Sequence, residues 1–332
     1  MRARINWIDS IRGLAFLMVI YYHLSTRDKG GIVPYFSPVF LTSFFFISGY
    51  LTKYNKSFSK VLEQRTRTLF MPLLIFGLGG GVLLASCKFN MDLFLTGCIE
   101  SLKGVFYQYG KHQTLWFIAS LYVYSLIFYW VNVVCKTAKR MFLCCLIMIV
   151  INQIVIYNFH CPMLPWKLNY CLWAVAIMGL GKVYREYENR IDTMFMKWYV
   201  ALPAFFVFII LVFYSHESIV FWGSANWFYA FVIPFTGMIW MLYLSKRIIV
   251  NNIPLLYIGA NSLIYFALHR QILTAVEAMT KRILQTLSLH PSVWINLCEV
   301  ILIAALIAVP VWIINKYIPQ VTGKGWKLWN TD

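Results

Sequence analysis

The chain has 332 residues, of which 61% are hydrophobic and only 12% are charged. Soluble globular chains carry roughly 45–50% apolar and 25% charged residues, so a soluble fold would have too few charges to cover its surface. Roughly 200 apolar residues are enough for about ten membrane-spanning helices of about 20 residues each. The net charge of +17 therefore points to basic loops beside a membrane before it points to nucleic acid.

Ten apolar segments follow one another along the chain, separated by clusters of charged or turn-forming residues. They cover residues 8–25, 36–52, 69–86, 114–135, 141–157, 168–184, 198–214, 226–244, 255–276 and 293–314. Segments of this length and hydrophobicity are typical of transmembrane helices. We therefore predict an all-α membrane protein of about ten transmembrane helices, organised as a single polytopic domain over residues 1–332.

Basic residues are divided unevenly between alternate loops. Nineteen Lys and Arg fall in the two terminal tails and in the loops on the same side, whereas eight fall in the loops of the opposite side. Because Lys and Arg accumulate in cytoplasmic loops, both termini are predicted to be cytoplasmic.

The first predicted span carries three polar side chains, Asp9, Arg12 and His23, and no cleavage site follows it, so we expect it to be retained. On a helix, Asp9 lies one turn before Arg12, within pairing range. Arg12 and His23 lie about 20° apart around the axis and about 16 Å apart along it. All three should share one face, with His23 toward the outside. The alternative interpretation is a basic anchor with an interfacial histidine.

Two further groups of polar residues stand at predicted span ends. Arg65 and Arg67 precede the third span, and the rigid guanidinium fork suits a cytoplasmic anion site for phosphates. Anchoring by positive-inside residues explains them equally well. His112 and Trp116 open the fourth span from the outside, where an aromatic belt is the alternative explanation.

The ninth predicted span carries a polar stripe. Asn261, Tyr265 and His269 are spaced four residues apart, so they share one helix face, and His269 should lie level with the histidine of the first span. Interhelical hydrogen bonding is the alternative explanation. Glu277 and Glu299 are candidate carboxylate partners for the imidazoles.

Several common site motifs are missing from the sequence. The eight cysteines form no zinc-type Cys/His spacing, so we predict no metal site. The sequence also has no Walker motif, HExxH or GxSxG, which counts against an ATP-driven pump, a zinc protease and an α/β-hydrolase.

Four blocks stand in order between residues 9 and 269. They are Asp9-Ser10-Ile11-Arg12-Gly13-Leu14-Ala15 with His23, Phe44-Phe45-Phe46-Ile47-Ser48-Gly49-Tyr50-Leu51, Arg65-Thr66-Arg67 before Pro72, and Leu115-Trp116-Phe117 with Ser262, Tyr265 and His269. Together they resemble the acyltransferase-3 family of integral-membrane acyltransferases, especially the branch that O-acetylates sugars of bacterial surface polysaccharides. The arginine block is spaced more loosely than in the family, so the choice of donor-binding arginine stays open.

The resemblance implies acetyl-CoA as donor co-substrate, no permanently bound cofactor, and a sugar hydroxyl as acceptor on a growing or lipid-linked glycan. It also implies that His23 is the catalytic group. In the combined model, Arg65 and Arg67, together with Arg12, bind the donor phosphates, and the pantetheine arm extends toward His23. His23 acts as general base, with an acetyl-histidine intermediate as the alternative. Asp9, grouped with the catalytic residues, is expected to pair with Arg12.

The acceptor side is expected to involve His112, Trp116 and His269, because aromatic faces suit sugars. Asn261, Tyr265 and His269 are candidate donors to the tetrahedral oxyanion, and the sequence does not choose among them.

The resemblance further implies a multi-pass protein of a bacterial inner membrane, in contact with membrane lipid and not with nucleic acid. Whether it forms a homo-oligomer stays open, as do the sugar, the hydroxyl and the acyl group. The competing interpretation is a polytopic transporter or flippase of a glycan or small solute, since intramembrane Arg, His and Glu suit a proton-coupled carrier. No paired halves with broken helices are visible in the sequence, which counts against it.

Overall fold

The computed structural model of the protein describes residues 5–25, 37–52, 56–86, 95–96, 99, 103, 115–158, 164–215, 227–288 and 292–324. Within these ranges the chain is helical and holds no strand. The α-helices are α1 (Asn6–Ser25), α2 (Ser37–Leu51), α3 (Phe58–Arg65), α4 (Met71–Ser86), α6 (Trp116–Val134), α7 (Ala138–Asn158), α8 (Cys171–Glu186), α9 (Glu188–Phe195), α10 (Trp198–Ser215), α11 (Trp227–Tyr243), α12 (Ile253–Ala260), α13 (Ser262–Thr286) and α14 (Val293–Tyr317). Short π segments form η2 (Thr66–Phe70) and η5 (Leu244–Ile248), and 3-10 segments form η4 (Pro165–Tyr170) and η6 (Pro319–Thr322).

Each of the ten predicted apolar segments contains a helix, which confirms the all-α prediction. In the part of the chain that the structure describes, three helices are long and apolar enough to cross a membrane by themselves: Trp116–Val134, Ala138–Ile156 and Val293–Tyr317. A fourth span results if Glu188–Phe195 and Trp198–Tyr214, which meet at 77°, are counted together. The ten transmembrane spans and the cytoplasmic position of both termini stay predictions.

The ninth predicted span differs from the expectation of one continuous helix. It consists of α12 and α13, which are separated at Asn261, where the backbone leaves the helical conformation (φ −116°, ψ 16°). A broken helix is therefore present after all, which weakens one argument made from the sequence against a carrier. Two intervals expected to be loops are also partly helical, since α3 lies within 53–68 and α9 within 182–197.

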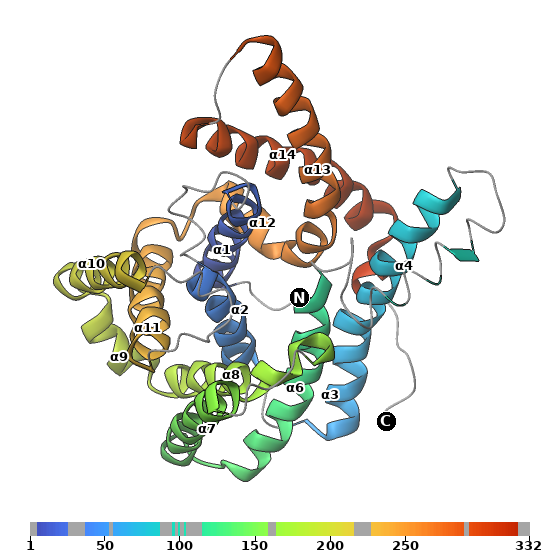
Figure 1. The fold of residues 1–332 in the computed structure, drawn as a ribbon. Helices are drawn as coiled ribbons and strands as arrows, with labels where there is room; N and C mark the ends of the chain where they lie inside the picture. The colour runs from blue at the N-terminus through green and yellow to red at the C-terminus, as the bar shows by residue number, and fades with distance from the viewer. Residues whose placement is uncertain are drawn as a thin grey trace.

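The helices are arranged around α1 and α2. In Figure 1, α13 and α14 lie on one side of this pair, α7 and α8 on the opposite side, α10 and α11 on a third, and α3, α4 and α6 on the fourth. The main helix contacts are α2 with α8, α1 with α12, α7 with α8, and α10 with α11. Buried apolar side chains from α1 to α14 form one continuous cluster.

A close crossing in the centre joins α1 to α12 through two glycines. A Cβ atom on Gly13 would lie 2.2 Å from the carbonyl oxygen of Leu255. A Cβ atom on Gly259 would lie 1.8 Å from the carbonyl oxygen of Asp9. The two backbones therefore touch from both sides, and the crossing tolerates only glycine at these positions.

A second crossing of the same kind joins α2 to α8. A Cβ atom on Gly49 would lie 1.8 Å from the carbonyl oxygen of Met178, and one on Gly181 would lie 2.0 Å from that of Phe46. The glycine of the Ser48-Gly49 block is thus explained by helix packing.

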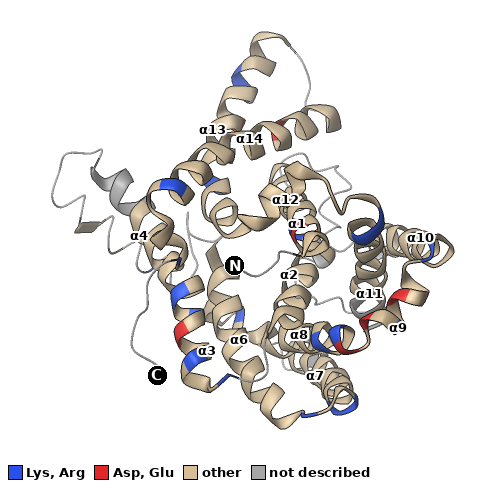
Figure 2. Cartoon of the chain, turned by 180° about the vertical axis from the view of Figure 1, so that it is seen from behind, with Lys and Arg blue, Asp and Glu red and all other residues tan. Residues whose placement is uncertain are grey.

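A polar network fixes one end of α8 and α9. The Lys246 ammonium donates to the carboxylates of Glu188 and Asp192. Tyr50 donates to Glu188 over 2.6 Å, and Tyr184 donates to Asp192 over the same distance. Figure 2 shows Lys, Arg, Asp and Glu gathered around the ends of α8 and α9 and along α3. The network therefore ties α9 to α2, α8 and η5.

We expect Gly259→Ala to lower the melting temperature of the detergent-purified protein, because the added methyl group would overlap the Asp9 carbonyl. Overpacking of this kind costs about 1–3 kcal/mol. Gly79→Ala in α4 is the matched control, since a Cβ atom there meets nothing within 4 Å. Equal melting temperatures for the two variants would contradict the proposed close crossing.

Candidate functional site

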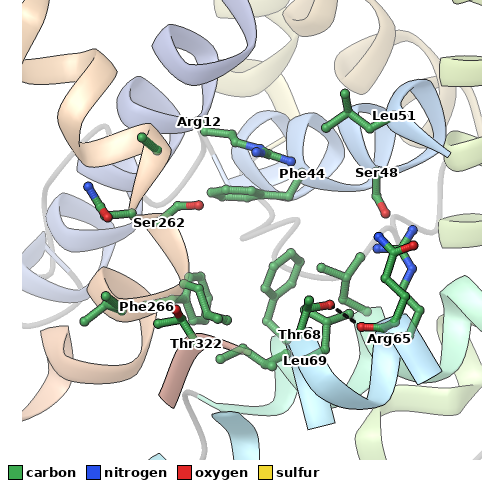
Figure 3. A pocket seen from close by; sticks show the side chains of 18 of the residues that line it. Arg12, Phe44, Ser48, Leu51, Arg65, Thr68, Leu69, Ser262, Phe266 and Thr322 are labelled. Carbon is green, nitrogen blue, oxygen red and sulfur yellow. Dashed lines mark hydrogen bonds between the residues drawn. The ribbon is translucent and has the colours of Figure 1, made fainter. Parts of the chain in front are cut away.

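A cavity of about 470 Å³ lies between α1, α2, α3, α6 and α13 and contains charged side chains. Three cations line it, Arg12 from α1, Arg65 from α3 and Lys324 after η6. No Asp or Glu of the described residues is among its lining. Its polar lining residues are Ser48, Gln64, Thr68, Asn261, Ser262 and Thr322. Figure 3 shows Arg12 and Ser48 on one side of the space and Thr322 with Phe266 on the other.

Arg12 is placed by the regular geometry of α1. Asp9, Arg12 and His23 all lie within the regular helix Asn6–Ser25, and the prediction that they share one face of it stays a prediction. Asp9 is buried and close enough to act on the Arg12 charge. This interaction offsets part of the cost of placing a guanidinium inside the bundle.

Arg65 is placed where α3 changes into the π segment η2. Such segments add a residue to a helical turn and are frequent at functional sites. The Arg65 Nη2 donates to Thr52 Oγ1 over 3.4 Å. Burial, and secondarily the charge of Arg12, lower the pKa of Arg65 to about 10. Arg65 therefore stays charged at neutral pH beside a second cation, which is an arrangement suited to a multivalent anion.

Arg67, the second arginine expected to bind the donor, has a different position. It is not among the residues that line the cavity. Its carbonyl oxygen lies directly against Gly323, where a Cβ atom would approach it to 2.3 Å. The structure thus places Arg65 in the cavity and Arg67 behind its wall.

Ser48 contributes an unusual polar group to the cavity. Its hydroxyl oxygen is buried and has no hydrogen-bond partner within the described ranges. A buried unsatisfied hydroxyl costs free energy, and a bound ligand could supply its partner. Ser48 belongs to one of the sequence blocks, but sequence analysis did not assign it to the site.

His23 and His269 come together away from this cavity. Their ring centroids lie 5.4 Å apart at an interplanar angle of 33°. His269 is completely buried, and its Nδ1 lies 2.7 Å from the carbonyl oxygen of Phe266. Since a carbonyl only accepts, Nδ1 carries the proton and Nε2 has a lone pair in the neutral ring. The expectation that the two histidines lie at one level is confirmed.

Three phenylalanines line the cavity, and one of them also contacts the histidine pair. Phe44, Phe117 and Phe266 all line the cavity and contact one another, with centroids 5.0 Å apart for Phe117 and Phe266. Phe266 also packs against the His269 ring, with centroids 5.4 Å apart. Phe266 therefore stands between the cationic cavity and the His269 ring.

The three candidate oxyanion donors are each bonded to a backbone carbonyl. Asn261 Nδ2 donates to Tyr257 over 2.9 Å, and the Tyr265 hydroxyl donates to Ala304 over 3.2 Å. His269 is committed to the Phe266 carbonyl, as described above. Asn261 lines the cationic cavity, which is a different place from the histidine pair. Their role at an oxyanion stays a prediction.

The remaining predicted residues that the structure describes lie on α6, α13 and α14 and do not line the cavity. Trp116 begins α6, and the Lys167 ammonium lies 5.8 Å from its ring centroid. Glu277 and Glu299 are buried on α13 and α14. His112 lies outside the described residues.

Sequence reasoning missed five polar residues of the cavity besides Ser48, and these are Gln64, Thr68, Ser262, Thr322 and Lys324. Gln64 and Thr68 flank the arginine of α3 by one turn or less, so proximity to Arg65 is a usable signal. Thr322 and Lys324 carry no such signal, because they follow the last helix in an unremarkable stretch.

Comparison with known proteins gives one match. The family model described as an acyltransferase domain matches residues 5–316. No curated protein and no solved structure matches the chain.

We predict that Arg65→Gln raises the melting temperature of the ligand-free protein and weakens its binding of an anion. Without ligand the variant should melt at a higher temperature than the wild type, because repulsion from Arg12 is removed. Its affinity for inorganic pyrophosphate, measured by ligand-dependent thermal shift, should fall about tenfold. Lys60→Gln is the control, since Lys60 lies exposed on the same helix. An Arg65→Gln variant that binds pyrophosphate like the control would contradict the anion site.

Proposed function

Because the chain belongs to the acyltransferase-3 family, a family of membrane acyltransferases, we propose that it is an O-acetyltransferase of a bacterial inner membrane. It transfers an acetyl group from cytoplasmic acetyl-CoA to a sugar hydroxyl. The acceptor is a surface polysaccharide, such as O-antigen, capsule or exopolysaccharide, or its lipid-linked precursor. One observation carries this proposal. Arg12 and Arg65 line the same cavity, and the described lining of that cavity holds no carboxylate.

The donor fits the charge of this cavity. Coenzyme A carries a diphosphate and a 3′-phosphate, and guanidinium groups bind phosphate oxygens in a bidentate manner. Arg12 and Arg65 are the side chains proposed to hold them. Ser48 and Thr68 line the same space and offer hydroxyl groups to the uncharged part of the donor.

The pantetheine arm would extend from the cavity toward His23. The rise of α1 separates the levels of Arg12 and His23 by about 16 Å, which is comparable to such an arm. The route passes the cluster of Phe44, Phe117 and Phe266, so at least one ring must move when the thioester reaches the imidazole. Apolar walls around the thioester would also exclude water and limit its hydrolysis.

His23 is the proposed general base. It takes the proton of the sugar hydroxyl, while the hydroxyl oxygen attacks the thioester carbonyl carbon. The tetrahedral intermediate collapses as the carbon–sulfur bond breaks, which leaves the acetyl ester on the sugar. The imidazolium returns its proton to the coenzyme A thiolate. His269 packs beside His23 and is proposed to hold that ring in position, since its own Nδ1–H is bonded to Phe266.

We expect His23→Ala to reduce acetyl transfer by at least about 100-fold while coenzyme A binding is retained. General base catalysis typically contributes about 10²–10⁴-fold to a rate. Transfer is measured by mass spectrometry of the glycan after incubation of purified protein with acetyl-CoA. Retained coenzyme A binding in a thermal-shift assay shows that the variant is folded.

The same assay separates the enzyme from the competing carrier. Detergent-purified protein has no membrane gradient, so acetylated product can form only by acyl transfer. Near-normal acetylation by His23→Ala would remove His23 from the mechanism. No product from the wild type with any surface glycan of the source cell would contradict the O-acetyltransferase proposal.

The phenylalanine cluster predicts a change in acyl-group selectivity. Phe44→Leu should widen the route past Phe44 and raise the relative kcat/KM for butyryl-CoA over acetyl-CoA, by about 10-fold if one or two methylenes are accommodated. Phe45→Leu is the matched control, because Phe45 is the next residue of α2 and is buried but does not line the cavity. Identical acyl selectivity in both variants would show that the route does not pass Phe44.

A further inference from the structure

The C-terminal segment Pro319–Lys324 forms part of the wall of the cationic cavity. Thr322 and Lys324 both line it, and Thr322 is seen beside Phe266, across the space from Arg65 (Figure 3). The segment follows α14 and packs as η6 against α4 and η2, which carries the residues after Arg65. A part of the chain remote in sequence from every predicted site residue therefore borders the site.

The segment is held in place by a specific backbone turn. Gly323 has a φ of +75°, a left-handed conformation that favours glycine. Its amide donates to the Gln320 carbonyl over 2.8 Å. A Cβ atom at Gly323 would lie 2.3 Å from the carbonyl oxygen of Arg67. The turn thus fits closely against η2 only because residue 323 has no side chain.

A chain of side-chain amides connects the segment to the break between α12 and α13. The Lys324 ammonium donates to Asn315 Oδ1 over 2.8 Å. Asn315 Nδ2 donates to Asn261 Oδ1 over 2.7 Å. Asn261 lines the cavity at the start of α13, so the chain of hydrogen bonds holds Lys324 at the rim of the same space.

The charges of the lining suggest what Lys324 does there. Arg12 and Arg65 come from α1 and α3, and Lys324 supplies a third positive charge from a separate segment. Three cations around one cavity with no described carboxylate in its lining favour a ligand with more than one anionic group. A lysine ammonium binds phosphate as a point charge, without the planar geometry that a guanidinium requires.

We propose that the segment Pro319–Lys324 is a structural part of the donor site and that Lys324 binds a phosphate group of the coenzyme A moiety. This inference rests on the proposed function, because it takes acetyl-CoA as the donor. It adds a binding residue and a wall that the family resemblance did not supply. It also gives Arg67 a role, since the Arg67 carbonyl supports the turn at Gly323.

The test compares the wild-type full chain with Lys324→Gln in detergent, with coenzyme A as the probe. We expect Lys324→Gln to weaken coenzyme A binding about tenfold, because a charge-assisted contact to phosphate is lost. Lys316→Gln is the control with the same loss of charge, since Lys316 is exposed and lies over the rings of Trp312 and Tyr317. Lys324→Arg should restore most of the affinity.

A second variant keeps the charge and moves the segment. Gly323→Ala should weaken coenzyme A binding to a similar extent, because the turn no longer fits against Arg67. If the wild type binds coenzyme A and both Lys324→Gln and Gly323→Ala bind it as tightly as Lys316→Gln, this inference is wrong and the proposed function stands. If the wild type itself fails to bind coenzyme A, the donor assignment and the inference are both wrong.

Discussion

The close crossing of α1 and α12 is the constraint on which the rest of the site depends. Gly13 follows Arg12 directly, and Gly259 precedes the break at Asn261 by two residues. Because both glycines allow backbone contact, the crossing brings Arg12 to the start of α13, where both border one cavity. Further along α1, His269 of α13 reaches His23. Two residues without side chains thus set the positions of a cation and of an imidazole pair.

The site is divided into a cationic part and an imidazole part, and Phe266 touches both. The proposed mechanism supplies a physical reason for this division. Phosphates require strong cations, which are costly to bury and are best kept near the end of the bundle. A thioester under attack requires a dry environment, which phenylalanine rings supply. The long arm of the donor is what allows the two requirements to be met in separate places.

The sequence predicted the features that depend on one regular helix. The common face of Asp9, Arg12 and His23 needs only the geometry of α1. The break at Asn261 was not predicted, because apolar residues continue on both sides of it and its partner Asn315 lies 54 positions away in sequence. The choice between Arg65 and Arg67 was also out of reach, since it depends on which face of η2 meets the bundle.

Positive charge in this protein can serve two purposes at once. Counting basic residues by loop assigns both Arg65 and Lys324 to topology, yet both line the cavity. The two roles are compatible, because the loops that are expected to be basic face the compartment from which an anionic donor arrives. Cations at the mouth of a low-dielectric cavity attract such a ligand before contact and then bind it. A net charge of +17 is therefore only partly a topological signal, because a cation that follows α14 can also belong to the cavity that its segment borders.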